Sequence, residues 1–326
     1  MLQPLKIGAL NFANPLIQGP LAGVSSAPFR RLVWQYSQPA YTCTEMISCK
    51  TLMHQSDAQL QRFIYKDATE GALCFQLSGN DINDVAEGVK KATAAGAALI
   101  DLNCGCPVKK IRSKRAGSQL LSDASRLYNI MCAMKQNTHV PVTVKIRVDG
   151  ASCDRNNLDI ARAVNDAGID ALIVHGRHWT EQYESPCRYD EINFFVKHVN
   201  VPVIGNGDVA CVDSFKKMLA TGCQGVMIAR AGVGQPWLIA QLLAEICGEM
   251  FPLPTAKAVG DMFMQHVHEL IQLLKSEKFA IIESRKLAKY YARRLISKNE
   301  FCLQMNECES WLDFRVLCET YFFQKG

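Results

Sequence analysis

The chain has 326 residues, 48% of them hydrophobic, and a formal net charge of +5 at pH 7. This length predicts one large domain with a smaller one, and the longest apolar runs are too short for a membrane helix. Because the net charge is modest, an anionic partner has to be bound by local basic patches.

The first 20 residues lack the charged leader and apolar core of a signal peptide. The 14 cysteines are scattered and form no CxxC pair, which favours reduced thiols in the cytoplasm. We therefore expect a cytoplasmic protein without a membrane partner, and we expect it to be a monomer.

Eight short β-rich segments predict the strands of one sheet. They are residues 15–19, 40–47, 72–77, 97–103, 141–148, 170–177, 201–207 and 225–230. Helical patterns fill most of the intervals, at residues 83–95, 123–136, 157–167 and 212–220. This alternation is typical of an α/β protein with a (β/α)8 TIM barrel. A doubly wound sheet is the alternative, but no G-x-G-x-x-G follows the first strand.

The pattern becomes wholly helical after Gly248. A short linker with Pro252 and Pro254 comes first, residues 259–275 and 280–298 predict two helices, and shorter pieces reach residue 323. We expect the barrel in residues 1–248 and a small helical bundle in residues 255–326.

Polar side chains collect where the predicted strands end, which is where barrel enzymes keep their chemistry. They are Gln18, Glu45, Gln76, Asn103, Cys106, Lys145, Arg147, His175, Arg177, Asn206, Asp208 and Arg230. As a set they indicate a binding site. The loops at Asn206–Asp208 and Ala229–Arg230 follow the seventh and eighth strands, a common place for phosphate binding.

The segment DLNCGCP (101–107) ends a buried strand in a turn that carries Cys106. Five cations follow without an acid, namely Lys109, Lys110, Arg112, Lys114 and Arg115. A thiol beside this charge indicates a reactive cysteine that meets an anionic polymer. Cys104 and Cys106 form a CxC pair, but no further ligands complete a zinc site, so we expect no metal.

Two strand residues have alternative interpretations. Lys145 points into the barrel mouth, where it either stabilises an electron-rich ring or forms a structural ion pair with Glu45 or Asp101. His175 either binds a ligand or is an ordinary core histidine.

A second basic patch lies on the last long predicted helix. Arg285, Lys286, Lys289 and Arg293 share one face, which binds nucleic-acid phosphates or is merely solvated. Tyr290 and Tyr291 either stack on bases or pack. His266 and His268 lie on different faces of their helix and are expected to be structural.

These segments resemble the tRNA-dihydrouridine synthases. Residues 20–30 (PLAGVSSAPFR) resemble the family's P-M-A-G-V-T-D-x-P-F-R motif, residues 101–121 its D-x-N-x-G-C-P signature with a basic loop, and residues 284–291 (SRKLAKYY) its R-K-x-x-x-Y. Residues 144–147, 174–177 and 205–209 complete the set over nearly the whole chain. There are departures: Leu21 replaces Met, Ala229 and Ala231 replace two glycines, and the segment after Arg177 keeps only Gln182 and Tyr183.

The resemblance implies an FMN-dependent enzyme that uses NADPH to reduce uridines of tRNA to 5,6-dihydrouridine. Hydride from the reduced flavin would reach C6, and Cys106 would give a proton to C5, a role that suits an unperturbed thiol. The target uridine has to be turned out of the tRNA stack.

The resemblance also implies two contact sets. FMN would contact Pro20, Leu21, Ala22, Gln76, Lys145, His175, Asn206, Gly207, Asp208, Ala229 and Arg230. The tRNA would contact Asn103, Arg177, Lys109, Lys110, Arg112, Arg285, Lys286, Lys289 and Arg293.

Two rival functions stay open. An FMN barrel similar to the dihydroorotate dehydrogenases would act on a free pyrimidine or a small enone, and it would not need the basic helical tail. A tRNA-binding factor without chemistry would need neither Cys106 nor Lys145 nor a flavin.

Overall fold

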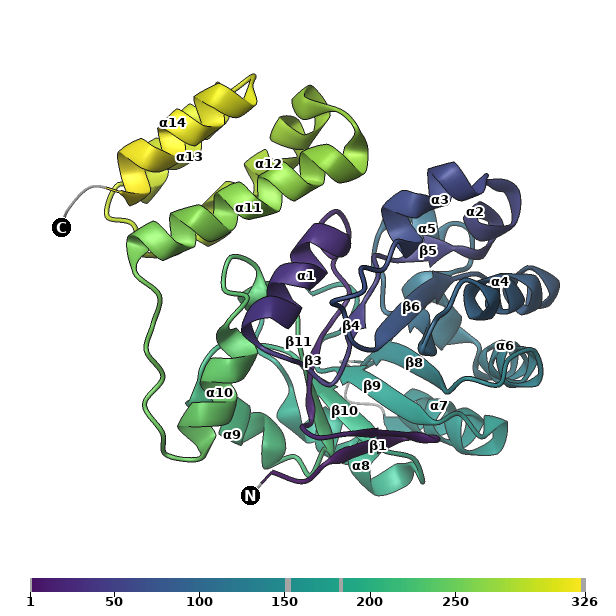
Figure 1. The fold of residues 1–326 in the computed structure, drawn as a ribbon. Coiled ribbons are helices and arrows are strands. Elements are labelled where there is room, and N and C mark those ends of the chain that lie inside the picture. Colours follow the sequence, from purple (N-terminus) through teal and green to yellow (C-terminus); the bar gives the residue numbers. More distant parts are fainter. Residues whose placement is uncertain (1, 150–153, 182–183, 324–326) are drawn as a thin grey trace.

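A computed structural model describes residues 2–149, 154–181 and 184–323. Parallel strands form one closed sheet with helices around it, a (β/α)8 TIM barrel (Figure 1). The strands are β3 (Leu16–Gln18), β4 (Thr42–Cys43), β5 (Ile47–Ser48), β6 (Leu73–Ser78), β7 (Leu99–Cys104), β8 (Val142–Arg147), β9 (Ala171–His175), β10 (Val203–Asn206) and β11 (Gly225–Ile228). Their order is β4-β3-β11-β10-β9-β8-β7-β6-β5, and a β4–β6 pairing closes the ring.

The predicted strand 40–47 consists of two separate pieces, β4 and β5. Between them the Thr44 hydroxyl donates to the Glu45 carbonyl at 2.8 Å and accepts from the Gln76 N–H at 3.1 Å. This side chain takes part in the hydrogen bonding in place of the backbone, so the ladder is interrupted. The interruption turns Glu45 and Met46 towards the barrel mouth, where the Glu45 carboxylate accepts from the Gly23 N–H at 2.5 Å and Met46 lines a cavity.

The helices around the barrel are α1 (Ala27–Tyr36), α2 (Cys49–His54), α3 (Asp57–Ile64), α4 (Ile82–Ala94), α5 (Lys109–Arg112), α6 (Ala124–Gln136), α7 (Asp154–Ala167), α8 (Tyr189–His198), α9 (Val212–Leu219) and α10 (Leu238–Ile246), with 3-10 turns η1 (Gly117–Ser122) and η2 (Arg230–Gly232). The four predicted barrel helices correspond to α4, α6, α7 and α9, and further helices lie between the other strands. Local capping explains a typical start: the Asp81 carboxylate accepts from the N–H groups of Asn83 and Asp84 at the beginning of α4.

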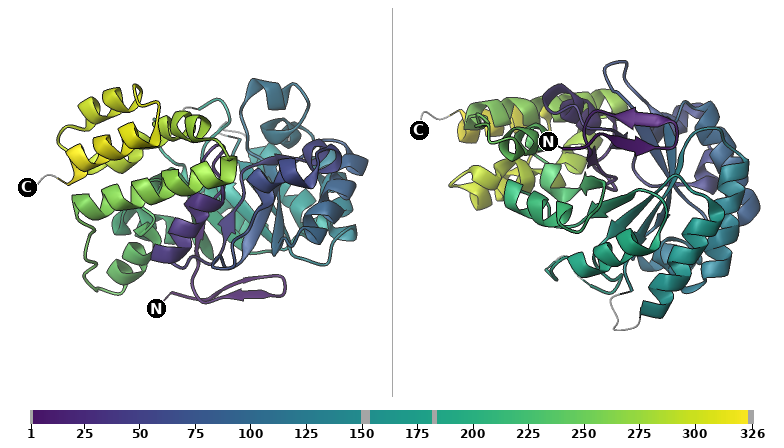
Figure 2. Two further views of the ribbon diagram at one scale, coloured as in Figure 1. Left: turned by 45° about the horizontal axis from the view of Figure 1, so that its top comes forward. Right: turned by 90° about the horizontal axis from the view of Figure 1, so that it is seen from below.

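An N-terminal hairpin that the sequence pattern did not predict plugs one end of the barrel. Strands β1 (Leu5–Ile7) and β2 (Leu10–Phe12) pair antiparallel, and Figure 2 shows the purple hairpin at the barrel end. Its side chains Leu5, Ile7 and Phe12 cluster with interior residues of the strands. Gly8 lies against Pro141 and Asp170, so the plugged end is the one where the strands begin.

The C-terminal helices pack on the barrel through α1. They are α11 (Ala256–Leu274), α12 (Glu277–Tyr291), the turn η3 (Ala292–Arg294), α13 (Lys298–Met305) and α14 (Trp311–Phe322). Phe29 and Val33 of α1 belong to the same apolar cluster as Phe263 and Tyr291 of these helices. Because α10 ends at Ile246 and α11 begins at Ala256, we propose the division into residues 1–248 and 255–326. None of the helices in the described ranges has the length and apolar character that a bilayer crossing needs.

The prediction of one continuous helix over residues 280–298 is wrong. Helix α12 ends at Tyr291, and the chain turns through η3 before α13 begins at Lys298. In a continued helix the Tyr290 carbonyl would accept the N–H four residues later. It accepts instead from Nε of Arg293 at 2.8 Å, so the side chain competes with the backbone and the helix stops.

Truncation inside the plug tests its contribution to stability. Ile7 is fully buried, so Ile7→Ala should lower the free energy of unfolding by about 2–5 kcal/mol. Lys6→Ala, at an exposed position of the same strand, is the control and should change it by no more than about 0.5 kcal/mol. Chemical denaturation measures both. An Ile7→Ala variant as stable as Lys6→Ala would show that the hairpin contributes nothing to the barrel core.

Candidate active site

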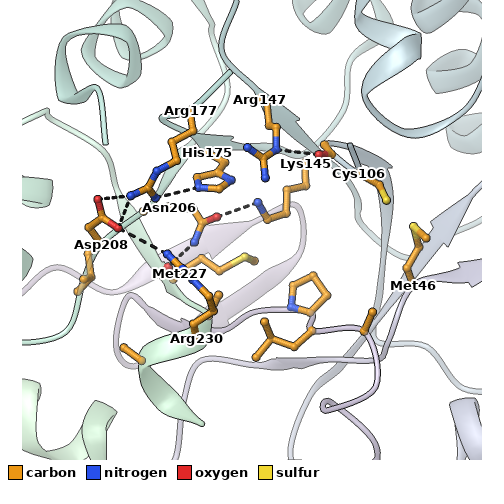
Figure 3. A pocket seen from close by; sticks show the side chains of 18 of the residues that line it. Met46, Cys106, Lys145, Arg147, His175, Arg177, Asn206, Asp208, Met227 and Arg230 are labelled. Atoms are coloured by element: carbon orange, nitrogen blue, oxygen red, sulfur yellow. Dashed lines mark hydrogen bonds and ion pairs between the residues drawn. The ribbon is translucent and has the colours of Figure 1, made fainter. Parts of the chain in front are cut away.

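A cavity of about 670 Å³ lies where the barrel strands end (Figure 3). It is lined by most of the residues predicted from the sequence, namely Pro20, Leu21, Ala22, Gln76, Asn103, Cys106, Lys145, His175, Arg177, Asn206, Gly207, Asp208, Ala229, Arg230, Lys289 and Arg293. The last two come from the helical region, so barrel and helices share the walls of one cavity.

The predicted contact sets omit Met46, Met227 and Lys298, which also line the cavity. Met46 lies near the end of the segment predicted as the second strand, so its place could have been inferred. Lys298 could not, because the predicted continuous helix hid the turn that brings it to the cavity. Gln182 and Tyr183 lie outside the residues that the structure describes.

Other predicted contact residues lie away from the cavity. Lys109 and Lys110 are exposed on α5. The guanidinium carbon of Arg112 lies 3.2 Å from the ring centroid of Trp179, and its nitrogens donate to Ser118 and Gln119 at 2.8 Å. Arg112 therefore holds two loops together through these contacts.

Two of the predicted tRNA contacts on α12 also have partners within the chain. Arg285 donates to the Cys308 carbonyl at 2.9 Å. Lys286 pairs with Glu283 at 2.5 Å and lies beside Gly23 in the loop after β3.

A buried carboxylate organises the polar side of the cavity. Asp101 accepts from the Thr143 hydroxyl at 2.7 Å and from the Gln76 amide nitrogen at 2.8 Å. Burial raises the pKa of the Asp101 carboxyl from 3.8 to about 6, although both hydrogen bonds and the Lys145 charge oppose the rise. At neutral pH the carboxylate is ionised and only accepts, so it fixes which way the Gln76 amide is turned.

The fixed amide orientation passes on to the cysteine loop. The Gln76 oxygen accepts from the Asn103 amide nitrogen at 2.9 Å. The Asn103 oxygen in turn accepts from the N–H groups of Gly105 at 3.2 Å and Cys106 at 2.9 Å. The oxygens of both amides are therefore engaged within the chain, and each amide nitrogen keeps a second hydrogen for a ligand.

The turn that carries Cys106 requires a glycine behind it. Gly117 has φ +61°, and a Cβ there would lie 2.8 Å from the Cys106 carbonyl oxygen. The same carbonyl accepts from the Ser118 N–H at 3.1 Å and from its hydroxyl at 3.0 Å. Asn103 thus holds the backbone N–H of Cys106 and Ser118 holds its carbonyl. The Cys106 side chain lines the cavity.

Lys145 forms no direct ion pair with Glu45 or Asp101, the two carboxylates considered from the sequence. It is held by a hydrogen bond to an amide instead. Its ammonium donates to the Asn206 oxygen at 2.8 Å, and the Asn206 nitrogen donates to the Met227 carbonyl at 2.8 Å. Burial, and to a lesser degree the Arg147 charge, lowers the pKa of Lys145 to about 8. Lys145 is therefore a half-buried cation held at the cavity wall.

The pKa of His175 reflects its burial and the positive charge of the cavity. Its pKa is lowered far below the usual range, first by burial and then by four surrounding cations, which are Lys145, Arg147, Arg177 and Arg230. The Arg177 guanidinium lies 3.5 Å from Nε2 of His175 and has only donors, so Nε2 is the acceptor of a neutral ring. The field that keeps this ring neutral favours an anionic ligand.

Arg177 is buried and faces an internal partner. One terminal nitrogen of Arg177 donates to both oxygens of the Asp208 carboxylate at 2.6 Å. The Cys187 N–H donates to the same carboxylate at 3.0 Å. Arg177 is 1% exposed, so this geometry supports a role in holding the loop after β10. It gives no support to the expected contact with tRNA.

The loops after the adjacent strands β10 and β11 lie side by side at the cavity wall. Asp208 has φ +53° and follows Gly207 with φ +140°, and its carboxylate lies 3.8 Å from an Arg230 nitrogen. Ala229, which departs from the family's glycine, has φ −115°. This φ lies outside the left-handed region that favours glycine.

The aromatic and histidine alternatives are resolved on α11 and α12. Tyr291 is buried, stacks on Phe263 with centroids 4.3 Å apart, and shares a hydrogen bond of 2.9 Å with His266. Burial lowers the pKa of His266 to about 3, so both residues are structural. Tyr290 instead lines the cavity, with Lys289 over its ring at 5.1 Å.

Comparison with known proteins gives consistent matches. The family model described as "Dihydrouridine synthase (Dus)" matches residues 17–324. A Proteus vulgaris protein named tRNA-dihydrouridine synthase B is 33% identical over 321 residues, which is 98% of this chain and 98% of the relative. Proteins of the same name from Escherichia coli K12 and Pseudomonas aeruginosa are each 32% identical, over 98% and 94% of this chain and 99% and 92% of their own length.

The raised pKa of Asp101 makes its effect on stability depend on pH. The folded state holds this proton more tightly than the unfolded state, so the wild type loses stability as pH rises from 3.8 to about 6. Asp101→Asn removes this loss. Its gain in unfolding free energy should therefore grow across this window and stay constant above it, with an upper limit of about 3 kcal/mol.

Chemical denaturation at a series of pH values measures this difference. Asp159→Asn, at a position paired with Arg162, is the control. Groups that do not interact with Asp101 cancel because they titrate alike in both proteins, and Lys145, with a pKa of about 8, titrates above the window. A difference that is flat between pH 4 and 7 would show that Asp101 does not titrate there.

Proposed function

The chain belongs to the dihydrouridine synthase family, and on this basis we propose that it reduces uridines of tRNA to 5,6-dihydrouridine, with bound FMN and NADPH as electron donor. The observation that carries the proposal is the single cavity that joins Cys106, the half-buried cation Lys145 and the helical side chains Lys289 and Tyr290. A reacting thiol, a cationic wall and a basic rim are what reduction of a nucleotide in an anionic polymer needs. The free cysteines are consistent with the cytoplasmic location that we also propose.

The residues of the cavity fit FMN. Its volume of about 670 Å³ lies in the range of about 300–1,000 Å³ typical of cofactor sites. The cations around His175 suit a phosphate, and the spare amide hydrogen of Gln76 suits an acceptor on the flavin ring. Residues that would hold the cofactor are Pro20, Leu21, Ala22, Gln76, Lys145, His175, Asn206, Gly207, Asp208, Ala229 and Arg230. When bound, FMN supplies the hydride that reaches C6 of the uracil.

The residues of this chain supply the proton and the orientation. Cys106 gives a proton to C5 as general acid, and Asn103 and Ser118 fix its peptide unit so that the thiol stays at the cavity wall. The spare amide hydrogen of Asn103 is placed to donate to a uracil carbonyl. Lys145 stabilises negative charge on the ring beside it, and its partial burial strengthens that interaction.

The tRNA has to bring the uridine to the cavity floor. A stacked base cannot reach a site among the strand ends, so the nucleotide is turned out of its helix. Two cations of α12 and α13 line the cavity, Lys289 and Lys298. Four more are exposed on the segment after Cys106, away from the cavity wall, namely Lys109, Lys110, Lys114 and Arg115. Both groups offer exposed or partly exposed positive charge to the phosphates on either side of the flipped nucleotide.

Substitution of the two neighbouring cysteines tests the chemistry. Cys106→Ala should lower the rate of dihydrouridine formation in tRNA about 10²–10⁴-fold, as loss of a general acid does, while visible flavin absorbance per chain stays at the wild-type level. Cys104 is fully buried and does not line the cavity, so Cys104→Ala is the control and should be mild. Equal loss in both variants would remove Cys106 from its proposed role.

The same preparations separate the proposal from its rivals. A protein that turns over free uridine as well as tRNA would be an FMN barrel for small pyrimidines. A protein purified without flavin that binds tRNA but does not change it would be a binding factor.

Charge reversal on the helical rim tests tRNA docking. Lys289→Glu should weaken tRNA binding and reduce the slope of log K against log salt by about 0.7–0.9 in magnitude for one lost phosphate contact. Lys257→Glu on α11 is the control, since this lysine pairs with Asp261 and does not line the cavity. Equal salt slopes for wild type and both variants would make Lys289 a solvated side chain without a tRNA contact.

A further inference from the structure

Arg293 bridges the helical region and the loop after β11. Its Nε donates to the Tyr290 carbonyl at 2.8 Å, and one terminal nitrogen donates to the Ala231 carbonyl at 3.3 Å. The other terminal nitrogen donates to the Val233 carbonyl. All three nitrogens of the guanidinium are therefore engaged with backbone carbonyls of this chain, which differs from the tRNA contact expected from the sequence.

The two backbones touch at the same place. Gly234 has φ +67°, and a Cβ there would lie 2.6 Å from the Tyr290 carbonyl carbon and 2.7 Å from the Tyr291 nitrogen. Val233 and Trp237 belong to the apolar cluster of Tyr291 and Phe263. The end of α12 thus rests directly on the loop, with no side chain between them.

The turn η2 (Arg230–Gly232) lies between this bridge and the cavity. Gly232 is seated on the buried side chain of Gln18, since a Cβ at Gly232 would lie 2.2 Å from the Gln18 oxygen. Arg230 and Ala231 line the cavity, and the carbonyl of Ala231 faces Arg293. A shift of Arg293 therefore moves a turn that Gln18 fixes on its other side.

We propose that Arg293 is a positioning residue that holds the phosphate-binding turn Arg230–Gly232 and couples tRNA docking on α12 to FMN affinity in the barrel. The inference rests on the proposed function, which places the FMN phosphate at this turn and tRNA at Lys289. Lys289 and Tyr290 lie on the last turn of α12, directly before the Arg293 bridge. A ligand that orders this helix end also orders the turn.

Thermodynamic linkage makes the coupling measurable. If bound tRNA lowers the Kd of FMN by some factor, bound FMN lowers the Kd of tRNA by the same factor. Both factors are set by the bridge, so both approach one when Arg293 is removed. A side chain that only stabilises the fold would lower the unfolding midpoint and leave these factors unchanged.

The test compares Arg293→Ala and Arg293→Lys with Arg294→Ala in full-length protein stripped of flavin. Arg294 is the matched control, because it is the adjacent arginine, is exposed, and does not line this cavity. The Kd of FMN is measured from the change in flavin fluorescence, with and without saturating tRNA. The measurements are made well below the unfolding midpoint of each variant.

Arg293→Ala should raise the Kd of FMN about fivefold or more and bring the coupling factor to one, and Arg294→Ala should match the wild type. Arg293→Lys keeps the charge but cannot hold three carbonyls, so an intermediate Kd is expected, and it carries the test if the alanine variant does not fold. Wild-type affinity and coupling in Arg293→Ala, or in Arg293→Lys when only that variant folds, would overturn the inference. A raised Kd with unchanged coupling would overturn the link to tRNA. A wild-type protein that binds no FMN would instead overturn the proposed function.

Discussion

The arrangement of the cavity depends on one buried charge. The Asp101 carboxylate can only accept hydrogen bonds, so the Gln76 amide has to turn its nitrogen inwards, and the oxygen of Asn103 has to meet the backbone of the Cys106 turn. One ionised group thus sets the direction of a chain of hydrogen bonds that ends at the backbone N–H groups of Gly105 and Cys106. Burial of this group is unfavourable for stability, as its raised pKa indicates, and local conflict of this kind is typical of functional sites.

The other charged side chains of the cavity are mostly cations, and the Asp208 carboxylate offsets part of their charge. Lys145 and Arg230 line the wall, while Arg177 is engaged by Asp208. Because Asp208 also meets the Cys187 backbone, its carboxylate fixes the loop after β10 and partly offsets the positive charge. The adjacent loop after β11 is fixed from outside the barrel by Arg293. Barrel and helices therefore form one site.

Much of this architecture followed from the sequence, because apolar runs with polar ends are a local signal. All the predicted strand segments contain observed strands. The missing details depend on contacts that are distant in sequence. The Thr44 hydroxyl splits one strand by bonding to Gln76, and Arg293 ends α12 by bonding across 60 and 62 residues. The sequence showed that Arg112 is a cation in a basic segment. It could not show that the guanidinium packs on the Trp179 ring, because that ring lies in another loop. The hairpin β1–β2 has strands of three residues each, too short for a periodic pattern.

The shortness of β4 has a consequence for what positions one side of the cavity. Strands β3 and β4 share one ladder pair, Gln18 and Thr42, with two further backbone hydrogen bonds beside it, whereas β7 and β8 pair over five positions. The segments that follow these two strands carry Pro20–Ala22 and Met46, which line the cavity. These residues are therefore positioned more by contacts between loops, such as the hydrogen bond from the Gly23 N–H to the Glu45 carboxylate, than by strand pairing.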